Sequence, residues 1–137
     1  MKSWRYSLVI PALLFVIYSI GTAAERKEFT ATIDKDGVQV VTMTGGSYFF
    51  DPNVVIVKVN VPVELRIKKE SGIVPHNIVL HAPEAGMDFK VELTTEPVVV
   101  KFTPTKTGKY PFYCDKKVPF FGSHREKGME GVLEVRE

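Results

Sequence analysis

Apolar and polar residues alternate in short stretches over most of the chain. Phe29–Ile33, Val63–Lys68 and Phe89–Leu93 show the alternation clearly, and Val54–Val59 is rich in β-branched residues. An apolar residue at every second position predicts a strand with one buried face. The complete set of predicted strands is Phe29–Ile33, Val38–Thr42, Tyr48–Phe50, Val54–Val59, Val63–Lys68, Asn77–Leu80, Phe89–Leu93, Val98–Phe102, Gly108–Cys114 and Gly131–Val135.

Turn-forming sequences separate these strands, and no stretch between them has the length and periodicity of an amphipathic helix. Asp34–Gly37 and Asp51–Asn53 are typical turn sequences. A helical turn fits only within Pro83–Met87 or in the long loop after Cys114. Short strands at this spacing predict an all-β fold, an antiparallel Greek-key β-sandwich.

The first 24 residues have the pattern of a secretory signal peptide. A positively charged start, Met1–Arg5, precedes an apolar run from Leu8 to Ile20 and the small residues Gly21–Ala24. The apolar run is shorter than the roughly 20 residues that a membrane-spanning helix needs. We therefore expect cleavage after residue 24, an exported or periplasmic domain of residues 25–137, and membrane contact only if the N-terminal segment is retained.

Removal of this segment would leave a domain with balanced charge. Without Lys2 and Arg5, the 18 basic residues fall to the same number as the 16 acidic residues. A balanced charge gives no electrostatic basis for binding nucleic acid or an anionic membrane surface. The remaining chain is long enough for one hydrophobic core, and we expect a monomer.

Candidate chemistry is concentrated near the C-terminus. Cys114 is the only cysteine of the chain, and His124 and Met129 follow it. A lone cysteine is often only a small buried apolar residue. Together, however, a thiolate, an imidazole and a thioether are the donors that soft and borderline metals prefer, copper above all. A loop closing between two neighbouring strands can bring these donors to one point, and Gly128 and Gly131 allow the backbone angles of such a return.

A fourth donor, His76, precedes the predicted strand Asn77–Leu80. Pro75 fixes its own φ and stiffens the chain next to this histidine. His81 lies five positions further on, so strand alternation places its side chain on the opposite face from that of His76. We therefore include His76 in the predicted site and leave His81 outside it.

Three separate segments resemble the cupredoxin family, and within it the plastocyanin-like proteins. Val74–Val79 resembles the segment with the first histidine ligand, and Gly108–Cys114 resembles the aromatic strand that leads to the cysteine ligand. His124–Gly131 resembles the segment with the second histidine and the axial methionine. The resemblance covers roughly residues 45–136, and the segments occur in the family's order.

This resemblance implies a copper site with defined ligands. One copper ion per chain would be held by His76, Cys114 and His124, with Met129 as the weak axial ligand. The resemblance also implies that Asn77 braces the ligand loops and offers its amide toward the thiolate.

The chain departs from the family in one respect. Nine residues separate Cys114 from His124, whereas the family's cysteine and second histidine usually lie only a few residues apart. The longer loop leaves open an altered geometry like that of the nitrosocyanin-type red copper proteins, with an open coordination position. The candidates for the axial position are Met129, Glu126, Glu130 and a water molecule.

We expect a small exported electron carrier and not an enzyme, since the sequence shows no general base, nucleophile pair or phosphate-binding loop elsewhere. Its partner would be a redox protein, either cytochrome-like or an oxidase or reductase. The apolar segment Val118–Phe121 would either form a docking patch beside His124, the ligand that reaches toward the surface in relatives, or cap the site against water. The alternatives are copper delivery without a redox partner and a red copper protein with an open coordination position.

Overall fold

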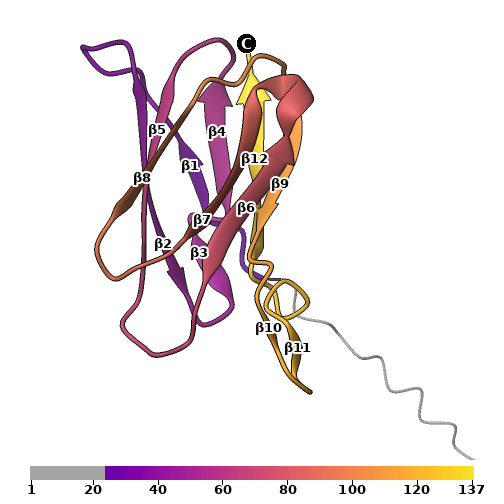
Figure 1. The fold of residues 1–137 in the computed structure, drawn as a ribbon. Helices are drawn as coiled ribbons and strands as arrows, with labels where there is room; N and C mark the ends of the chain where they lie inside the picture. The colour runs from indigo at the N-terminus through magenta and orange to yellow at the C-terminus, as the bar shows by residue number, and fades with distance from the viewer. Residues whose placement is uncertain (1–23) are drawn as a thin grey trace, which may run out of the picture.

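The structure, a computed structural model, describes residues 24–137, and these form two β-sheets that pack face to face (Figure 1). The six-stranded sheet contains, in spatial order, β1 (Glu28–Thr30), β4 (Val54–Lys58), β12 (Glu130–Arg136), β9 (Gly108–Tyr113), β6 (Asn77–Ala82) and β7 (Met87–Glu92). The four-stranded sheet contains β3 (Phe49–Asp51), β2 (Gln39–Gly46), β5 (Val63–Lys69) and β8 (Val98–Phe102). The predicted all-β sandwich is confirmed.

Two short elements complete the described part of the chain. A single 3₁₀ turn, η1 (Pro83–Ala85), lies within the stretch where the sequence allowed a helical turn. The loop after Cys114 contains a small antiparallel hairpin, β10 (Lys117–Val118) with β11 (Gly122–Ser123), which the sequence did not predict. Within residues 24–137, no helix has the length and hydropathy needed to cross a bilayer. The predicted signal peptide lies outside the described residues, apart from Ala24.

Some strand pairs are parallel, so the two sheets are mixed and not purely antiparallel. Strand β4 pairs in parallel with both β1 and β12, and β2 pairs in parallel with β5. The alternation of apolar residues indicates which face of a strand is buried, but it carries no information on strand direction. Strand β4 lies between two parallel neighbours and buries four consecutive residues, Val54–Val57, as expected for a β-branched run inside a sheet.

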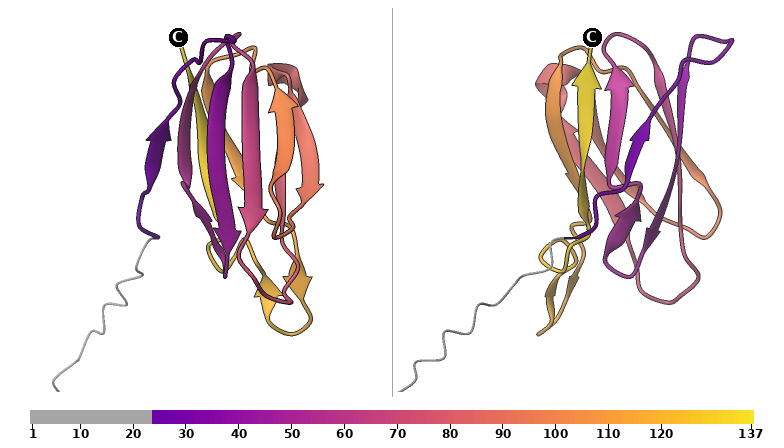
Figure 2. Two further views of the ribbon diagram at one scale, coloured as in Figure 1. Left: turned by 90° about the vertical axis from the view of Figure 1, so that its left-hand side faces the viewer. Right: turned by 180° about the vertical axis from the view of Figure 1, so that it is seen from behind.

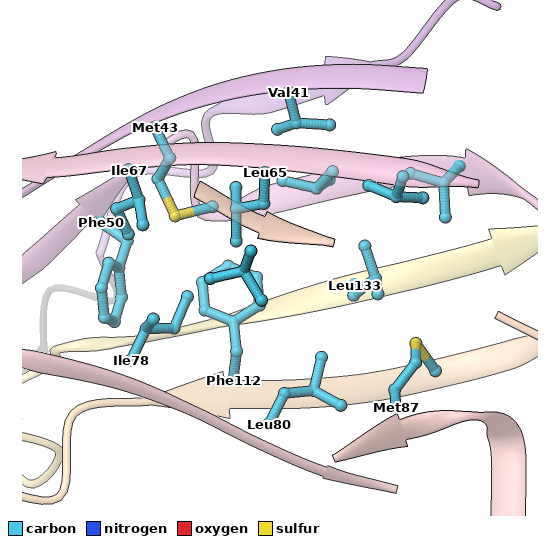
Figure 3. Close-up of a cluster of buried hydrophobic side chains, with 14 of the residues drawn as sticks. Val41, Met43, Phe50, Leu65, Ile67, Ile78, Leu80, Met87, Phe112 and Leu133 are labelled. Atoms are coloured by element: carbon cyan, nitrogen blue, oxygen red, sulfur yellow. The ribbon is translucent and has the colours of Figure 1, made fainter. Parts of the chain in front are cut away.

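The core lies between the two sheets, where the inward-facing residues of each strand meet (Figure 3). Val41 and Met43 of β2 and Leu65 and Ile67 of β5 face the side chains of the other sheet, and each is at most 5% exposed. Phe50 and Phe112 meet edge to face across the sandwich, with ring centroids 5.4 Å apart. This tightly filled core gives the strand ends fixed positions.

The candidate ligands lie at one end of the sandwich. Strand β9 ends there, while β6 and β12 begin there, and the β10–β11 hairpin projects from the same end (Figures 1 and 2). The β5–β6 loop, which leads to His76, also lies at this end (Figure 1). The candidate site is therefore supported by strand ends from a packed sandwich.

Candidate metal centre

Three predicted ligands meet at this end of the sandwich. His76 immediately precedes β6 and Cys114 immediately follows β9, and β6 and β9 are neighbours in the six-stranded sheet. His124 follows β11 on the loop that returns to β12. The Nδ1 atoms of the two histidines are 3.1 Å apart, and Cys114 Sγ is 3.5 Å from His124 Nδ1. One donor atom from each residue lies within 4.8 Å of the others, and all three residues are buried.

Met129 is held beside these residues by its backbone. Its amide donates to the His124 carbonyl oxygen at 3.0 Å, and its carbonyl oxygen accepts from the Cys114 amide at 3.0 Å. The side chain is fully buried. Gly45 leaves room for it, because a Cβ at Gly45 would stand 3.3 Å from Met129 Cε and 2.9 Å from Leu93 Cδ1.

The two alternative carboxylate ligands point elsewhere. Glu126 is exposed, and its Oε2 accepts from the Ser123 amide at 2.8 Å. Glu130 is also exposed and accepts from Arg125 Nε at 2.8 Å. Of the three side chains considered for the axial position, only Met129 is buried beside the cluster.

Asn77 links the two segments that carry His76 and Cys114. Its backbone amide donates to Cys114 Sγ at 3.5 Å, so the amide expected to face the sulfur is that of the main chain. Its side chain instead makes a reciprocal pair with Asp115: Nδ2 donates to Asp115 Oδ1 at 2.7 Å, and Oδ1 accepts from the Asp115 amide at 3.0 Å. Lys90 Nζ donates to the other carboxylate oxygen of Asp115 at 2.6 Å.

The charge of Asp115 is stabilised by this network. The hydrogen bond from Lys90, followed by that from Asn77, holds the pKa of the Asp115 carboxyl below its usual range. Asp115 and Lys90 were not among the residues singled out in the sequence. The position of Asp115 next to the cysteine was the only local signal, since Lys90 reaches it from a different strand.

Replacing Asn77 with alanine should lower the free energy of unfolding of the copper-free protein by about 2–3 kcal/mol. The substitution removes a side-chain bond to a carboxylate and leaves the Asp115 amide without its acceptor. Chemical denaturation measures the change. Asn53→Ala is the matched control. The Asn53 side chain also accepts one hydrogen bond from a backbone amide and donates one to a backbone carbonyl oxygen, but both of these hydrogen bonds are exposed to solvent. An equal loss in both variants would contradict a special role for Asn77.

Burial sets the protonation of the cluster. It lowers the pKa of His76, aided by the nearby His124 and Lys69, and lowers the pKa of His124, aided by Lys127 and Lys116. Burial raises the pKa of the Cys114 thiol. The imidazoles are therefore kept neutral, the form that binds metal, while the thiol needs a nearby cation to favour its thiolate.

The residues fit a copper ion. Two neutral imidazoles, one thiol and a buried thioether form the donor set of a trigonal His₂Cys copper site with a weak axial ligand. The two Nδ1 atoms and the sulfur converge, and binding a metal ion would offset the solvation that the two buried imidazoles lose.

His124 is more deeply buried than the family resemblance implied. Its side chain is fully buried, and its Nε2 has no hydrogen-bond partner. The Tyr48 ring packs against the His124 ring at nearly a right angle, with centroids 5.1 Å apart, and Lys127 Nζ lies 4.7 Å from the centroid of the Tyr48 ring. The expectation that His124 reaches toward the surface is therefore wrong, because its side chain is buried and packs against the Tyr48 ring.

The apolar segment Val118–Phe121 does not fold over the site. The ring of Phe120 is completely exposed, and Phe121 is 69% exposed. Phe120 occupies the turn of the β10–β11 hairpin with a left-handed φ of 67°. These two phenylalanines therefore do not cap the cluster against water.

His81 lies outside the cluster, as strand alternation predicted. Its side chain is 70% exposed and its Nδ1 lies 2.8 Å from Asp88 Oδ1. The glycines of the closing loop play two different roles. Gly128 has a φ of 104°, which fits the predicted tight return, but Gly131 is a strand residue without a positive φ.

Comparisons with known proteins agree with this architecture. Residues 7–133 match the family of cupredoxin-like domains. No curated protein matches the sequence. The metal-binding domain of a Cu(I)-exporting P-type ATPase from Streptococcus pneumoniae is similar in structure, with a TM-score of 0.62 and 16% identity over 82% of this chain and 99% of that one.

Two auracyanins are also similar. Dithionite-reduced auracyanin from Roseiflexus castenholzii has a TM-score of 0.58 and 20% identity over 72% of this chain and 97% of that one. Auracyanin A, a blue copper protein from Chloroflexus aurantiacus, has a TM-score of 0.53 and 23% identity over 73% of this chain and 100% of that one. At these identities the similarity concerns the fold, while the family match extends over most of the sequence. The chain belongs to the family of cupredoxin-like domains.

Proposed function

We propose that this protein is an exported, mononuclear copper protein that carries electrons between redox partners. The observation that carries the proposal is the convergence of His76, Cys114 and His124, all buried, within 4.8 Å of one another. Copper bound there would supply one-electron chemistry between Cu(I) and Cu(II). His76, Cys114 and His124 would be its strong ligands and Met129 its weak axial ligand.

The scaffold supports this role. The cluster is anchored on three strands of the packed sandwich, and the Asn77–Asp115 pair ties two ligand segments together. Ligands that are held by packing move little when the charge of a bound ion changes, and a small rearrangement favours fast electron exchange. Export would follow from the signal peptide expected in residues 1–24, most of which lie outside the described region.

Copper delivery is the second candidate function. It is favoured by the similarity in fold to the metal-binding domain of a Cu(I)-exporting ATPase. A delivery protein would bind Cu(I) reversibly and would not need a stable Cu(II) state. The burial of every donor except a small part of His76 supports the carrier instead, because cargo must be released to a partner.

Spectra of the copper-loaded protein test the proposal. An electron carrier should show an intense visible band, a Cu(II) signal with narrow hyperfine splitting in electron paramagnetic resonance, and reversible voltammetry. A protein that holds only Cu(I) and cannot be oxidised reversibly would indicate delivery. A tetragonal Cu(II) signal that changes on adding azide would indicate a red copper site with an open coordination position.

A further inference from the structure

The two histidines of the cluster differ in their access to solvent. His124 is completely buried, whereas His76 remains 6% exposed. Since His76 Nδ1 faces the cluster, His76 is the residue that connects the donors to the exterior. Among His76, Cys114, His124 and Met129, only His76 has more than zero exposure.

A small cleft opens onto His76. Its volume is about 60 Å³, and its walls include Ser47 of the β2–β3 turn and Glu70, Ser71 and Val74 of the β5–β6 loop. This volume holds a few water molecules at most. The cleft therefore brings solvent, but not a large group, to the edge of this ligand.

The surface beside the cleft is mainly apolar, with one exposed carboxylate, that of Glu70, in the wall of the cleft. Ile73 is 99% exposed and Val74 is 41% exposed, and the segment Ser71–Pro75 contains no charged residue. Lys69 Nζ donates to the carbonyl oxygens of Gly72 and Val74, which holds the loop in shape. An exposed apolar surface that is held in place beside a ligand is typical of a contact surface.

The hairpin on the other side of the site has a different character. Its phenylalanines are flanked by basic residues, with Lys127 Nζ 5.7 Å from the centroid of the Phe121 ring and Lys117 exposed on β10. The ligand behind it, His124, is covered by Tyr48. A protein bound at the hairpin would therefore touch no ligand of the cluster.

We propose that electrons enter and leave the site through His76, at the mainly apolar surface formed by Ser47, Glu70 and Ser71–Pro75. The partner that fits this surface is a redox protein whose own contact surface is mainly apolar, because Glu70 supplies the one negative charge in the lining of the cleft and further charged groups would lose solvation here without gaining a partner. One electron passes in each encounter, and no bond or proton is exchanged. This inference rests on the proposed electron-carrier function and assigns the surface at which that function is performed.

Chemical modification of the copper-free protein tests whether His76 is more accessible to solvent than His124, as electron transfer through His76 requires. Diethyl pyrocarbonate acylates accessible imidazole nitrogens, and peptide mass spectrometry reports each histidine separately. We expect His81 to react first, His76 next and His124 last. Ser47→Trp, which fills the cleft, should slow the reaction at His76 and leave that at His81 unchanged. Reaction of His124 as fast as that of His76 would overturn the proposal.

Electron exchange with small redox probes tests the route itself. The reduced copper protein is mixed with hexacyanoferrate(III), an anion, and separately with tris(phenanthroline)cobalt(III), a cation, so that steering by surface charge can be recognised. Each probe takes up one electron, which oxidises the protein. We expect Ser47→Trp to slow both reactions severalfold, and Ser71→Trp offers a second exposed position at which to fill the cleft. The double variant with Phe120→Ser and Phe121→Ser should react with both probes at the rate of the unchanged protein.

The outcomes separate the route from the function. Slower exchange in the hairpin variant, or unchanged exchange when the cleft is filled, would overturn the His76 route while leaving the electron-carrier function intact. A reduced protein that reacts with neither probe would instead remove the electron-carrier function, and the route with it.

Discussion

Replacing Cys114 with serine should abolish the intense visible absorption of the copper-loaded protein. Such a band requires charge transfer from a thiolate to the metal, and Cys114 is the only cysteine in the chain. Serine is close to cysteine in shape but its hydroxyl is a much weaker and harder donor. The expected result is loss of the band at every copper concentration, measured by absorption together with electron paramagnetic resonance.

Met129→Leu is the matched control for this substitution. Met129 is as fully buried as Cys114, and its carbonyl oxygen accepts a hydrogen bond from the Cys114 amide. Leucine has a volume similar to that of methionine, so the substitution should preserve the packing. An axial thioether contributes little to the visible band, so the band should persist and shift while the reduction potential changes. Survival of the band in Cys114→Ser would show that the ligand assignment is wrong.

The position of the cluster could be predicted because each ligand lies next to a strand boundary. His76 follows a proline and precedes an apolar run, and Cys114 ends an aromatic strand. Alternation also placed His81 outside the site, since faces follow directly from sequence spacing. Local patterns of this kind are enough to locate residues on a sandwich before its structure is known.

Other features depended on contacts between distant parts of the chain. The parallel pairing of β4 with β12 and of β2 with β5 has no counterpart in the alternation of apolar residues. The burial of His124 involves Tyr48, which lies 76 positions earlier and whose ring packs against the imidazole at nearly a right angle. The hydrogen bond between Lys90 and Asp115 likewise joins strand β7 to the loop after β9, two segments with no shared motif. Tertiary packing decided these features, and no single segment contains the information.

The burial of His124 also changes what the extra residues between Cys114 and His124 can do. In the sequence, the length of this loop suggested an open coordination position. In the structure, the loop forms a hairpin that projects outward (Figure 2), and the second histidine that follows the hairpin is fully buried. Among the four candidate ligands, His76 alone keeps some exposure, and it lines the small cleft beside the β5–β6 loop.

Replacing Gly131 with alanine should lower the free energy of unfolding by about 3–5 kcal/mol. This loss is as large as, or larger than, the greatest losses usually caused by adding atoms to a well-packed core. A Cβ at this position would stand 2.4 Å from the Asn53 carbonyl oxygen and 2.4 Å from Phe112 Cζ. The carbonyl oxygen is fixed because it accepts from the Val132 amide at 2.9 Å. Phe112 is fixed because it is buried and packs edge to face against Phe50.

The same substitution should disturb the copper site, because Gly131 pairs with Phe112 two residues before Cys114 and follows Met129 by two residues. Gly37→Ala is the control: its φ is 77°, but no atom lies within 4 Å of the added Cβ, so only backbone strain of about 1 kcal/mol applies. Denaturation of the copper-free proteins measures both costs, and the visible band of the loaded proteins reports the site. We expect a large loss of stability and an altered band for Gly131→Ala alone. A cost no greater than that of Gly37→Ala would mean that β12 can move away from β9 and Asn53, and that the close approach of these segments does not hold Met129 beside the cluster.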